Sequence, residues 1–290
     1  EFGVELPLPL VFRDPTIAGL ANLIDTHEEF SVAPRTPVAD PVIAPLVYRR
    51  TPAKTQKDFY IISGAGGHVL PFAGVVKNLM DDWSAVGLLD PVLAGEDPVA
   101  SVEETAARMI RALEAADARE PFLLAGYSFG GLVAHEMATQ LREDGKKVGV
   151  VLLDTRSTHL ATKARRVYRA LADQKNRMRD FVQEFRPKAG DEPNGHVEDD
   201  DRPRRARLRM HQPQIGRRYV PTRHDAPTVL LRSQSGKAPM AKPDHGWSEI
   251  LPQLEMLHVA GSHLDMFKGQ NEKGFSETLQ VALMMLSAKL

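Results

Sequence analysis

The sequence predicts an α/β domain built on a mostly parallel β-sheet with helices on both faces. One observation behind this is a rhythm that starts at Phe59, where short apolar runs begin to alternate with stretches of helical periodicity. Parallel strands joined by crossover helices produce such a pattern. A second observation is a glycine-flanked serine at the junction of one such strand and the helix after it. The apolar runs expected to be strands are 59–62, 84–89, 121–126, 148–154, 227–232 and 254–260.

Clear helix signals lie between and after these runs. Ser101 and Glu104 form a capping box at the start of a helix whose apolar residues, from 102 to 113, repeat on one face. A second helix is expected over about 130–144, because Gly145 supplies the residue type that ends helices. A final helix carries apolar residues on one side at 275, 279, 282, 283 and 286.

Composition limits the classes of function. The 290 residues are enough for one large domain, with or without an insertion. Lys plus Arg (37) nearly balances Asp plus Glu (38), so net charge favours neither nucleic acid nor an anionic membrane as a partner. The absence of cysteine excludes disulfides, thiolate catalysis and cysteine-ligated metals, and we expect no bound metal. No apolar run approaches the roughly 20 residues of a membrane span, and the first ten residues lack signal-peptide features. A cytoplasmic location is therefore expected.

The chain divides unevenly. Residues 1–27 contain one amphipathic helix after the start signal Asp14-Pro15-Thr16, which is less than a domain. Residues 28–55 carry five prolines and are expected to be a stiff linker. Residues 56–290 form the main domain.

An insertion at about 156–224 interrupts the rhythm of the main domain. It contains helix-like stretches over 161–185 and then a strongly charged segment, in which 198–201 are all acidic and five arginines follow by position 209. We expect this charged segment to be a mobile loop.

The most specific feature is Gly126-Tyr127-Ser128-Phe129-Gly130, directly after an apolar run and directly before a helix. In this context G-x-S-x-G indicates a sharp turn that exposes a nucleophilic serine at the carboxyl edge of the sheet. The glycines are needed because side chains there would collide with the neighbouring helix or strand. We expect Ser128 to be the nucleophile of an α/β-hydrolase fold with an inserted helical lid.

A serine needs a base, and the base needs a carboxylate, in the chain order Ser, acid, His for this architecture. Asp154 ends the strand that follows the helix of Ser128 and is the favoured acid. The alternative is Asp244, because the segment directly after the next strand offers no earlier carboxylate. His263 lies just past the last strand and is the favoured base. Among the other histidines, His68 is the serious rival, since it lies in the loop after the first strand.

That loop, Ser63-Gly64-Ala65-Gly66-Gly67, is expected to complete an oxyanion hole. Small residues let backbone N–H groups approach a substrate carbonyl. We expect the N–H groups of Ala65 and Phe129 to be the two donors. A phosphate-binding interpretation is weaker, because the loop lacks G-x-G-x-x-G and the Lys-Ser/Thr pair of a P-loop.

With these residues assigned, the chain resembles the C-terminal thioesterase domains of nonribosomal peptide synthetases and related polyketide synthases. The resemblance runs from about Phe59 to the C-terminus and includes SGAGGHVLPF, GYSFGG, VVLLD, Gly246-Trp247 and VAGSHLDMF. An acid directly after the strand that follows the nucleophile's helix is a habit of that family. The segment GVELPLPLVFRDPTIAGLANLI resembles the end of an acyl or peptidyl carrier domain, so 1–27 looks like the remnant of one.

The resemblance implies a chain-terminating thioesterase. Its substrate would be an acyl or peptidyl chain held as a thioester on the phosphopantetheine arm of an upstream carrier domain, with no cofactor bound by this fragment itself. The insertion at 156–224 would be the lid over the acyl channel, and arginines 202–209 would meet the carrier domain or the phosphate of its arm, unless they are only a solvated surface. The lid side chains expected to face substrate or core are Val167, Tyr168, Leu171, Met178 and Phe181.

Two other functions stay open at this point. One is a stand-alone editing thioesterase or an esterase, and the other is a catalytically silent hydrolase fold used for docking. The sequence does not indicate which acyl chain is released, or whether release is by hydrolysis or by cyclisation.

Overall fold

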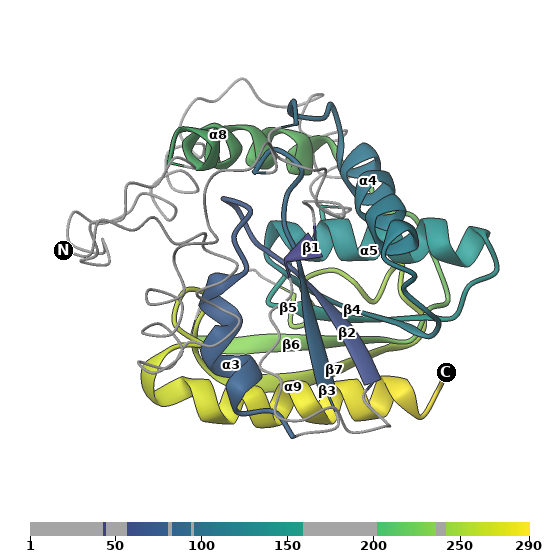
Figure 1. Ribbon diagram of the computed structural model, residues 1–290. Coiled ribbons are helices and arrows are strands. Elements are labelled where there is room, and N and C mark those ends of the chain that lie inside the picture. The colour runs from purple at the N-terminus through teal and green to yellow at the C-terminus, as the bar shows by residue number, and fades with distance from the viewer. Residues whose placement is uncertain (1–42, 45–56, 81–82, 94–95, 159–201, 236–241) are drawn as a thin grey trace, which may run out of the picture.

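The structure is a computed structural model (Figure 1). It describes residues 43–44, 57–80, 83–93, 96–158, 202–235 and 242–290. The expected carrier remnant 1–27, most of the expected linker 28–55 and the expected lid side chains between 167 and 181 lie outside the described residues.

The described strands form a seven-stranded sheet in the order β1-β3-β2-β4-β5-β6-β7. All neighbours pair in parallel except β1, which is antiparallel to β3. The strands predicted from the apolar runs are confirmed, with ends shifted by a few residues. The two-residue β1 is too short to leave a periodic signal, and it lies within the range expected to be linker. The bounds are β1 Ile43–Ala44, β2 Lys57–Ile62, β3 Trp83–Leu88, β4 Phe122–Tyr127, β5 Val148–Leu153, β6 Thr228–Ser235 and β7 Leu254–Ser262.

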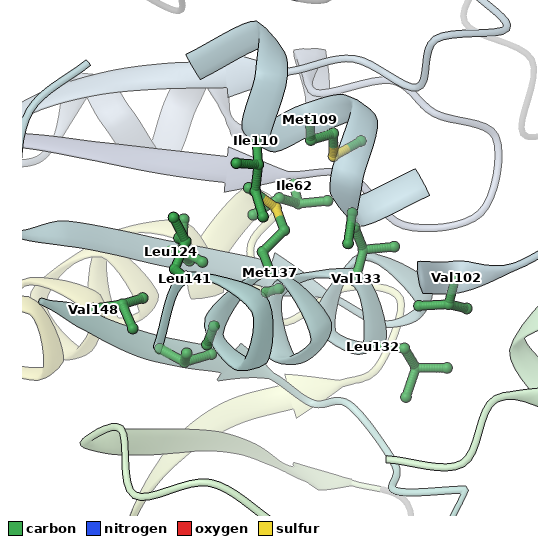
Figure 2. Packing of buried hydrophobic residues seen from close by; sticks show 14 of the residues in the cluster. Ile62, Val102, Met109, Ile110, Leu124, Leu132, Val133, Met137, Leu141 and Val148 are labelled. Carbon is green, nitrogen blue, oxygen red and sulfur yellow. The ribbon is translucent and has the colours of Figure 1, made fainter. Parts of the chain in front are cut away.

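Helices cover both faces of this sheet, as predicted. Along β2, Tyr60 and Ile62 belong to the core on one face, whereas Phe59 and Ile61 belong to the core on the other. Because successive strand side chains point to opposite faces, both sets must be covered. The first core includes residues of α4 (Val102–Ala115) and α5 (Phe129–Glu143), shown in Figure 2. The second includes residues of α3 (Ala73–Lys77) and α9 (Glu272–Ser287), which lie on the opposite side of the sheet in Figure 1.

The predicted helix ends are confirmed. The Ser101 hydroxyl accepts from the Glu104 N–H at 3.2 Å, and the Glu104 carboxylate accepts from the N–H of Ala100, one residue earlier than the capping box requires. Gly145 follows α5 with φ of 74°, a conformation that favours glycine. Short 3-10 turns precede α3 at Leu70–Phe72 and α9 at Gly269–Asn271. None of the helices in the described ranges is long and apolar enough to cross a bilayer.

The prediction of a mobile loop for the arginine-rich segment is wrong. Arginines 202–209 lie on a helix, α8 (Arg202–Arg218), which packs above α5 (Figure 1). Its buried residues Leu208, Gln212 and Ile215 recur at helical spacing and continue to the buried Tyr219. One of these is a polar glutamine, so the apolar periodicity is incomplete, and the surrounding charges hide the helix from a pattern search.

A buried polar cluster lies between α5 and the segment that joins α8 to β6. His135 Nδ1 lies 2.8 Å from the Tyr219 hydroxyl, which donates to Glu136 at 2.8 Å. The rings of His135 and His224 are 4.5 Å apart, and His224 Nδ1 accepts from the N–H of Ala226. Burial lowers the pKa of His135, and it also lowers the pKa of His224, to about 4. Both rings are therefore neutral in the folded protein at pH 7.

This cluster makes stability fall with acidification. Unfolded His224 titrates near pH 6.5 and folded His224 near 4, so the unfolded state binds more protons across that window. As the pH drops from 6.5 to 4, His224 should cost on the order of 3 kcal/mol of unfolding free energy. We expect His224→Asn, whose side chain can still accept from Ala226, to flatten that fall in urea denaturation measured at pH 7 and 4.5.

The exposed His258 on β7 offers the matched control. His258→Gln should leave the wild-type difference between the two pH values intact. Parallel losses of stability in wild type and His224→Asn would show that His224 is not the acid-sensitive group.

Candidate active site

Ser128 occupies the turn between β4 and α5 in a strained backbone conformation, with φ of 53° and ψ of −115°. The flanking glycines are required by space. A Cβ on Gly126 would lie 2.3 Å from the carbonyl oxygen of Gly130, and one on Gly130 would lie 2.2 Å from that of Ser63. Contacts this close do not occur, so the predicted reason for both glycines is confirmed. A non-glycine residue held at such angles costs of the order of 1–3 kcal/mol and is typical of functional sites.

The parallel sheet brings the other two predicted residues together. Asp154 directly follows β5, and His263 directly follows β7. Because both strands end at the same edge of the sheet, these residues meet although they are 109 positions apart, with His263 Nδ1 at 2.9 Å from Asp154 Oδ2. Ser128 follows β4, the neighbour of β5, at that same edge. All three predicted residues therefore follow carboxyl ends of strands in one sheet.

Asp154 is held as an ion by several donors. Its side chain is buried, and it accepts from the backbone N–H of Ser233 at 3.0 Å and from the Ser233 hydroxyl at 2.8 Å. Burial by itself would raise the pKa of Asp154, but the hydrogen bonds from His263 and Ser233 outweigh it and leave the pKa below its ordinary value. The carboxylate is therefore charged and acts as an acceptor toward the Nδ1–H of His263.

Tyr127, the residue before Ser128, fixes the position of His263. The two rings stack with centroids 4.9 Å apart, and the Tyr127 hydroxyl donates to the backbone carbonyl of His263 at 2.6 Å. Burial, assisted by the charge of Asp154, raises the pKa of Tyr127, so the hydroxyl keeps its proton. This contact places the imidazole of His263 beside the turn that carries Ser128.

A second histidine that sequence reasoning does not single out also lies beside Asp154. His245 is buried, with Nε2 3.7 Å from Asp154 Oδ1. The turn that carries His245 is held in place by Trp247, whose indole N–H donates to the carbonyl of Thr155 at 2.8 Å. The sequence feature directly after His245 is Gly246-Trp247, which is part of the family resemblance. It does not indicate that His245 lies beside Asp154. Sequence reasoning also misses Ser233. It looks for carboxylates after the apolar run 227–232, and Ser233 carries a hydroxyl instead.

The two rival residues have other positions. Asp244 is largely buried, and its carboxylate accepts from the N–H groups of Gly246 and Ser248, so it caps the turn that leads to Trp247. His68 lies in the loop after β2, whereas the ring bonded to Asp154 is that of His263. The geometry favours Asp154 and His263 in both cases.

The two expected oxyanion donors lie in suitable backbone positions. Phe129 is the first residue of α5, so its N–H has no preceding helical turn to bond. Ala65 is the exposed residue of a tight turn in which the N–H of Gly67 donates to the carbonyl of Gly64 at 3.1 Å. Within the parts of the chain that the structure describes, the N–H of Ala65 makes no hydrogen bond. Their role as a pair stays a prediction.

Comparison with known proteins identifies the family. A family model described as "Thioesterase domain" matches residues 59–280. The chain belongs to the thioesterase family. Family and fold together make it a hydrolase. The match covers the sheet from Phe59 in β2 onward, the helices α3, α4 and α5, the first part of α9 and the turn of Ser128.

Curated relatives of this thioesterase are synthetases. The chain is 30% identical to a dimodular nonribosomal peptide synthase of Bacillus subtilis (strain 168) over 159 residues, which is 54% of this chain and 6% of that protein. It is 32% identical to malpibaldin synthetase of Mortierella alpina over 159 residues, which is 53% of this chain and 3% of that protein. The matched region is thus a small part of much longer multidomain proteins.

Solved structures confirm the α/β-hydrolase type of fold. The NocB thioesterase domain from the nocardicin cluster, in covalent complex with a fluorophosphonate nocardicin G analog, aligns with a TM-score of 0.63 and 22% identity, covering 79% of this chain and 95% of that one. A four-domain nonribosomal peptide synthetase bound to AMP and glycine aligns with a TM-score of 0.67 and 19% identity, covering 97% of this chain and 22% of that one.

Proposed function

We propose that this thioesterase terminates assembly of an acyl or peptidyl chain by taking it from the phosphopantetheine thioester of a carrier domain onto Ser128. The observation that carries the proposal is the hydrogen bond between His263 and Asp154 at the sheet edge where Ser128 is held in its strained turn. The similarity of the chain to parts of nonribosomal peptide synthetases supports a carrier-bound acyl or peptidyl thioester as the substrate class.

Acylation follows from the protonation states of these groups. Asp154 accepts from Nδ1–H of His263, so in the neutral ring Nε2 is the nitrogen that can take the proton of the Ser128 hydroxyl. The serine oxygen then attacks the thioester carbonyl. The N–H groups of Ala65 and Phe129 would stabilise the oxyanion of the tetrahedral intermediate. His263 returns its proton to the leaving sulfur, which frees the pantetheine thiol and leaves the acyl chain as an ester of Ser128.

Release repeats these steps with a second nucleophile. Water, or an amine or hydroxyl of the bound chain, attacks the ester carbonyl while His263 removes its proton. The same proton then passes to the Ser128 oxygen as the ester bond breaks. Water gives a linear acid, and an internal nucleophile gives a ring.

The position of α8 supports an upstream carrier domain as the partner. Its exposed residues include Arg204, Arg207 and Arg209, and a Cβ on Gly66 would lie 3.4 Å from Nε of Arg209. Arg209 therefore lies directly over the loop of Ala65. Exposed guanidinium groups on a helix that borders this loop suit an acidic carrier domain docked beside the site, or the phosphate at the distal end of its pantetheine arm.

The test is to offer wild-type protein a panel of acyl and peptidyl thioesters of N-acetylcysteamine, a mimic of the end of the pantetheine arm. We expect intact mass spectra to show one acyl group added, with the adduct mapping to the peptide that contains Ser128. We also expect liquid chromatography with mass spectrometry to identify linear or cyclic products. Oxygen esters of the same acyl chains are the matched control and should react more slowly.

A different pattern would overturn the proposal. A protein that forms no adduct with any thioester and also resists a fluorophosphonate probe would be a docking module. Equal turnover of thioesters and oxygen esters would indicate a general esterase.

A further inference from the structure

Gln212 joins α8 to the loop expected to form the oxyanion hole. Its side chain is buried at 2% exposure. The carboxamide oxygen accepts from the backbone N–H of Gly66 at 2.8 Å, and the carboxamide nitrogen donates to Asp90 Oδ2 at 2.8 Å. One side chain thus links α8, the loop after β2 and the segment after β3.

Asp90 determines which way the carboxamide points. Asp90 is also buried, and its other oxygen, Oδ1, accepts from the N–H of Val92 at 3.0 Å. A carboxylate can only accept, so the nitrogen of Gln212 must face Asp90 and its oxygen must face Gly66. Reversing the amide would place two donors against each other at Gly66 and two acceptors against each other at Asp90.

The bond to Gly66 constrains the neighbouring Ala65. Gly66 has φ of 101° and Gly67 has φ of 75°, so the turn depends on backbone angles that glycine adopts readily. The N–H of Gly67 closes the turn on Gly64, and the N–H of Gly66 is taken by Gln212. The bond from Gly67 holds the peptide between Gly64 and Ala65, which carries the Ala65 N–H, and the bond to Gln212 holds the next peptide, between Ala65 and Gly66. Gln212 therefore limits rotation of the backbone at Ala65 from its C-terminal side.

The same helix also contacts the second expected donor residue. A Cβ on Gly216, one turn after Gln212, would lie 3.2 Å from the ring of Phe129. Residues of α8 thus lie against both Gly66 and Phe129.

We infer that Gln212, oriented by Asp90, is a positioning residue that sets the oxyanion donor Ala65 through its bond to Gly66. The inference rests on the proposed function of the Ser128 site. It predicts that the rate of acylation depends on the hydrogen-bond polarity at a buried amide that does not touch the substrate.

Exchanging the hydrogen-bond donor and acceptor between Gln212 and Asp90 tests the inference. Gln212→Glu would place two carboxylates against each other, and Asp90→Asn would turn an amide nitrogen toward that of Gln212. Each single variant should lower kcat for a thioester about 10- to 100-fold with little change in KM, because removing an oxyanion donor outright costs about 10²–10³. In the double variant Asp90→Asn with Gln212→Glu, the asparagine nitrogen can donate to the glutamate, which still accepts from Gly66. We expect kcat within about threefold of wild type.

Leu208, one turn earlier on α8, supplies the matched control. It is buried against Val92 and Leu93 and lies over Gly67, yet its side chain makes no hydrogen bond. Leu208→Val should lower the melting temperature while kcat stays within about threefold of wild type. Hydrogen exchange of the peptide 62–68 should quicken in both single variants and return to the wild-type rate in the double variant.

The outcomes separate this inference from the proposed function. If both single variants keep wild-type kcat, or the double variant stays as slow as either of them, Gln212 does not position the loop. If Leu208→Val lowers kcat as much as Gln212→Glu does, packing of α8 is responsible instead. If wild-type Ser128 forms no acyl adduct and takes no fluorophosphonate, the proposed function fails first.

Discussion

Ser128→Ala should reduce turnover of an acyl thioester by a factor on the order of 10⁶, the scale seen when the nucleophile of a serine hydrolase is removed. The alanine keeps the Cβ and the backbone angles of the turn, and it removes only the oxygen that attacks the thioester. The fold should therefore persist. Intact mass spectrometry should find no acyl adduct and no fluorophosphonate adduct on this variant. A retained covalent adduct would assign the nucleophile to another residue.

Ser128→Gly is the informative control, because it also removes the backbone strain. With φ of 53° and ψ of −115°, glycine should be more comfortable than serine at this position. Relief of about 1–3 kcal/mol of strain exceeds the roughly 0.5–1 kcal/mol that glycine costs in chain entropy. We expect this variant to be as inactive as Ser128→Ala but to melt at a higher temperature. A lower melting temperature would mean that the turn stores little strain.

Much of the fold was predictable because each of the six longer strands, β2 to β7, contains a short apolar run, and the parallel pairing of these strands then places their carboxyl ends at one edge. Asp154 and His263 could be paired on that reasoning alone. The two-residue β1 could not be predicted, because only its pairing with β3 in the structure identifies it as a strand. The helix α8 could not either, because its buried face includes Gln212 and its other residues are mostly charged.

The parts of the site that sequence reasoning misses are contacts made across the sheet edge. Tyr127 stands at the variable position of G-x-S-x-G, and only the structure shows that its hydroxyl reaches the backbone of His263. Ser233 and His245 belong to separate segments that converge on Asp154. Convergence of this kind depends on loop paths, for which apolar periodicity carries no information.

Asp154→Asn should lower kcat by about four orders of magnitude, as neutralising the acid of a serine triad does elsewhere, because the asparagine would impose the wrong tautomer on His263. The backbone N–H of Ser233 faces Oδ1, so the asparagine must place its own oxygen there. Its NH₂ then occupies the position of Oδ2 and points at Nδ1 of His263. Two donors cannot face each other, so Nδ1 must give up its proton and Nε2 must carry it. A protonated Nε2 cannot accept the proton of Ser128.

Asp244→Asn is the matched comparison, because it makes the same chemical change at the rival acid. Its carboxylate caps the turn at Gly246 and Ser248, so we expect a lower melting temperature with kcat close to wild type. Steady-state kinetics with one thioester substrate compares the two variants directly. A large loss of kcat in Asp244→Asn alone would transfer the role of the acid to Asp244. Similar small losses in both would show that His263 keeps its tautomer without a carboxylate, which would remove the reason for burying Asp154 at the sheet edge.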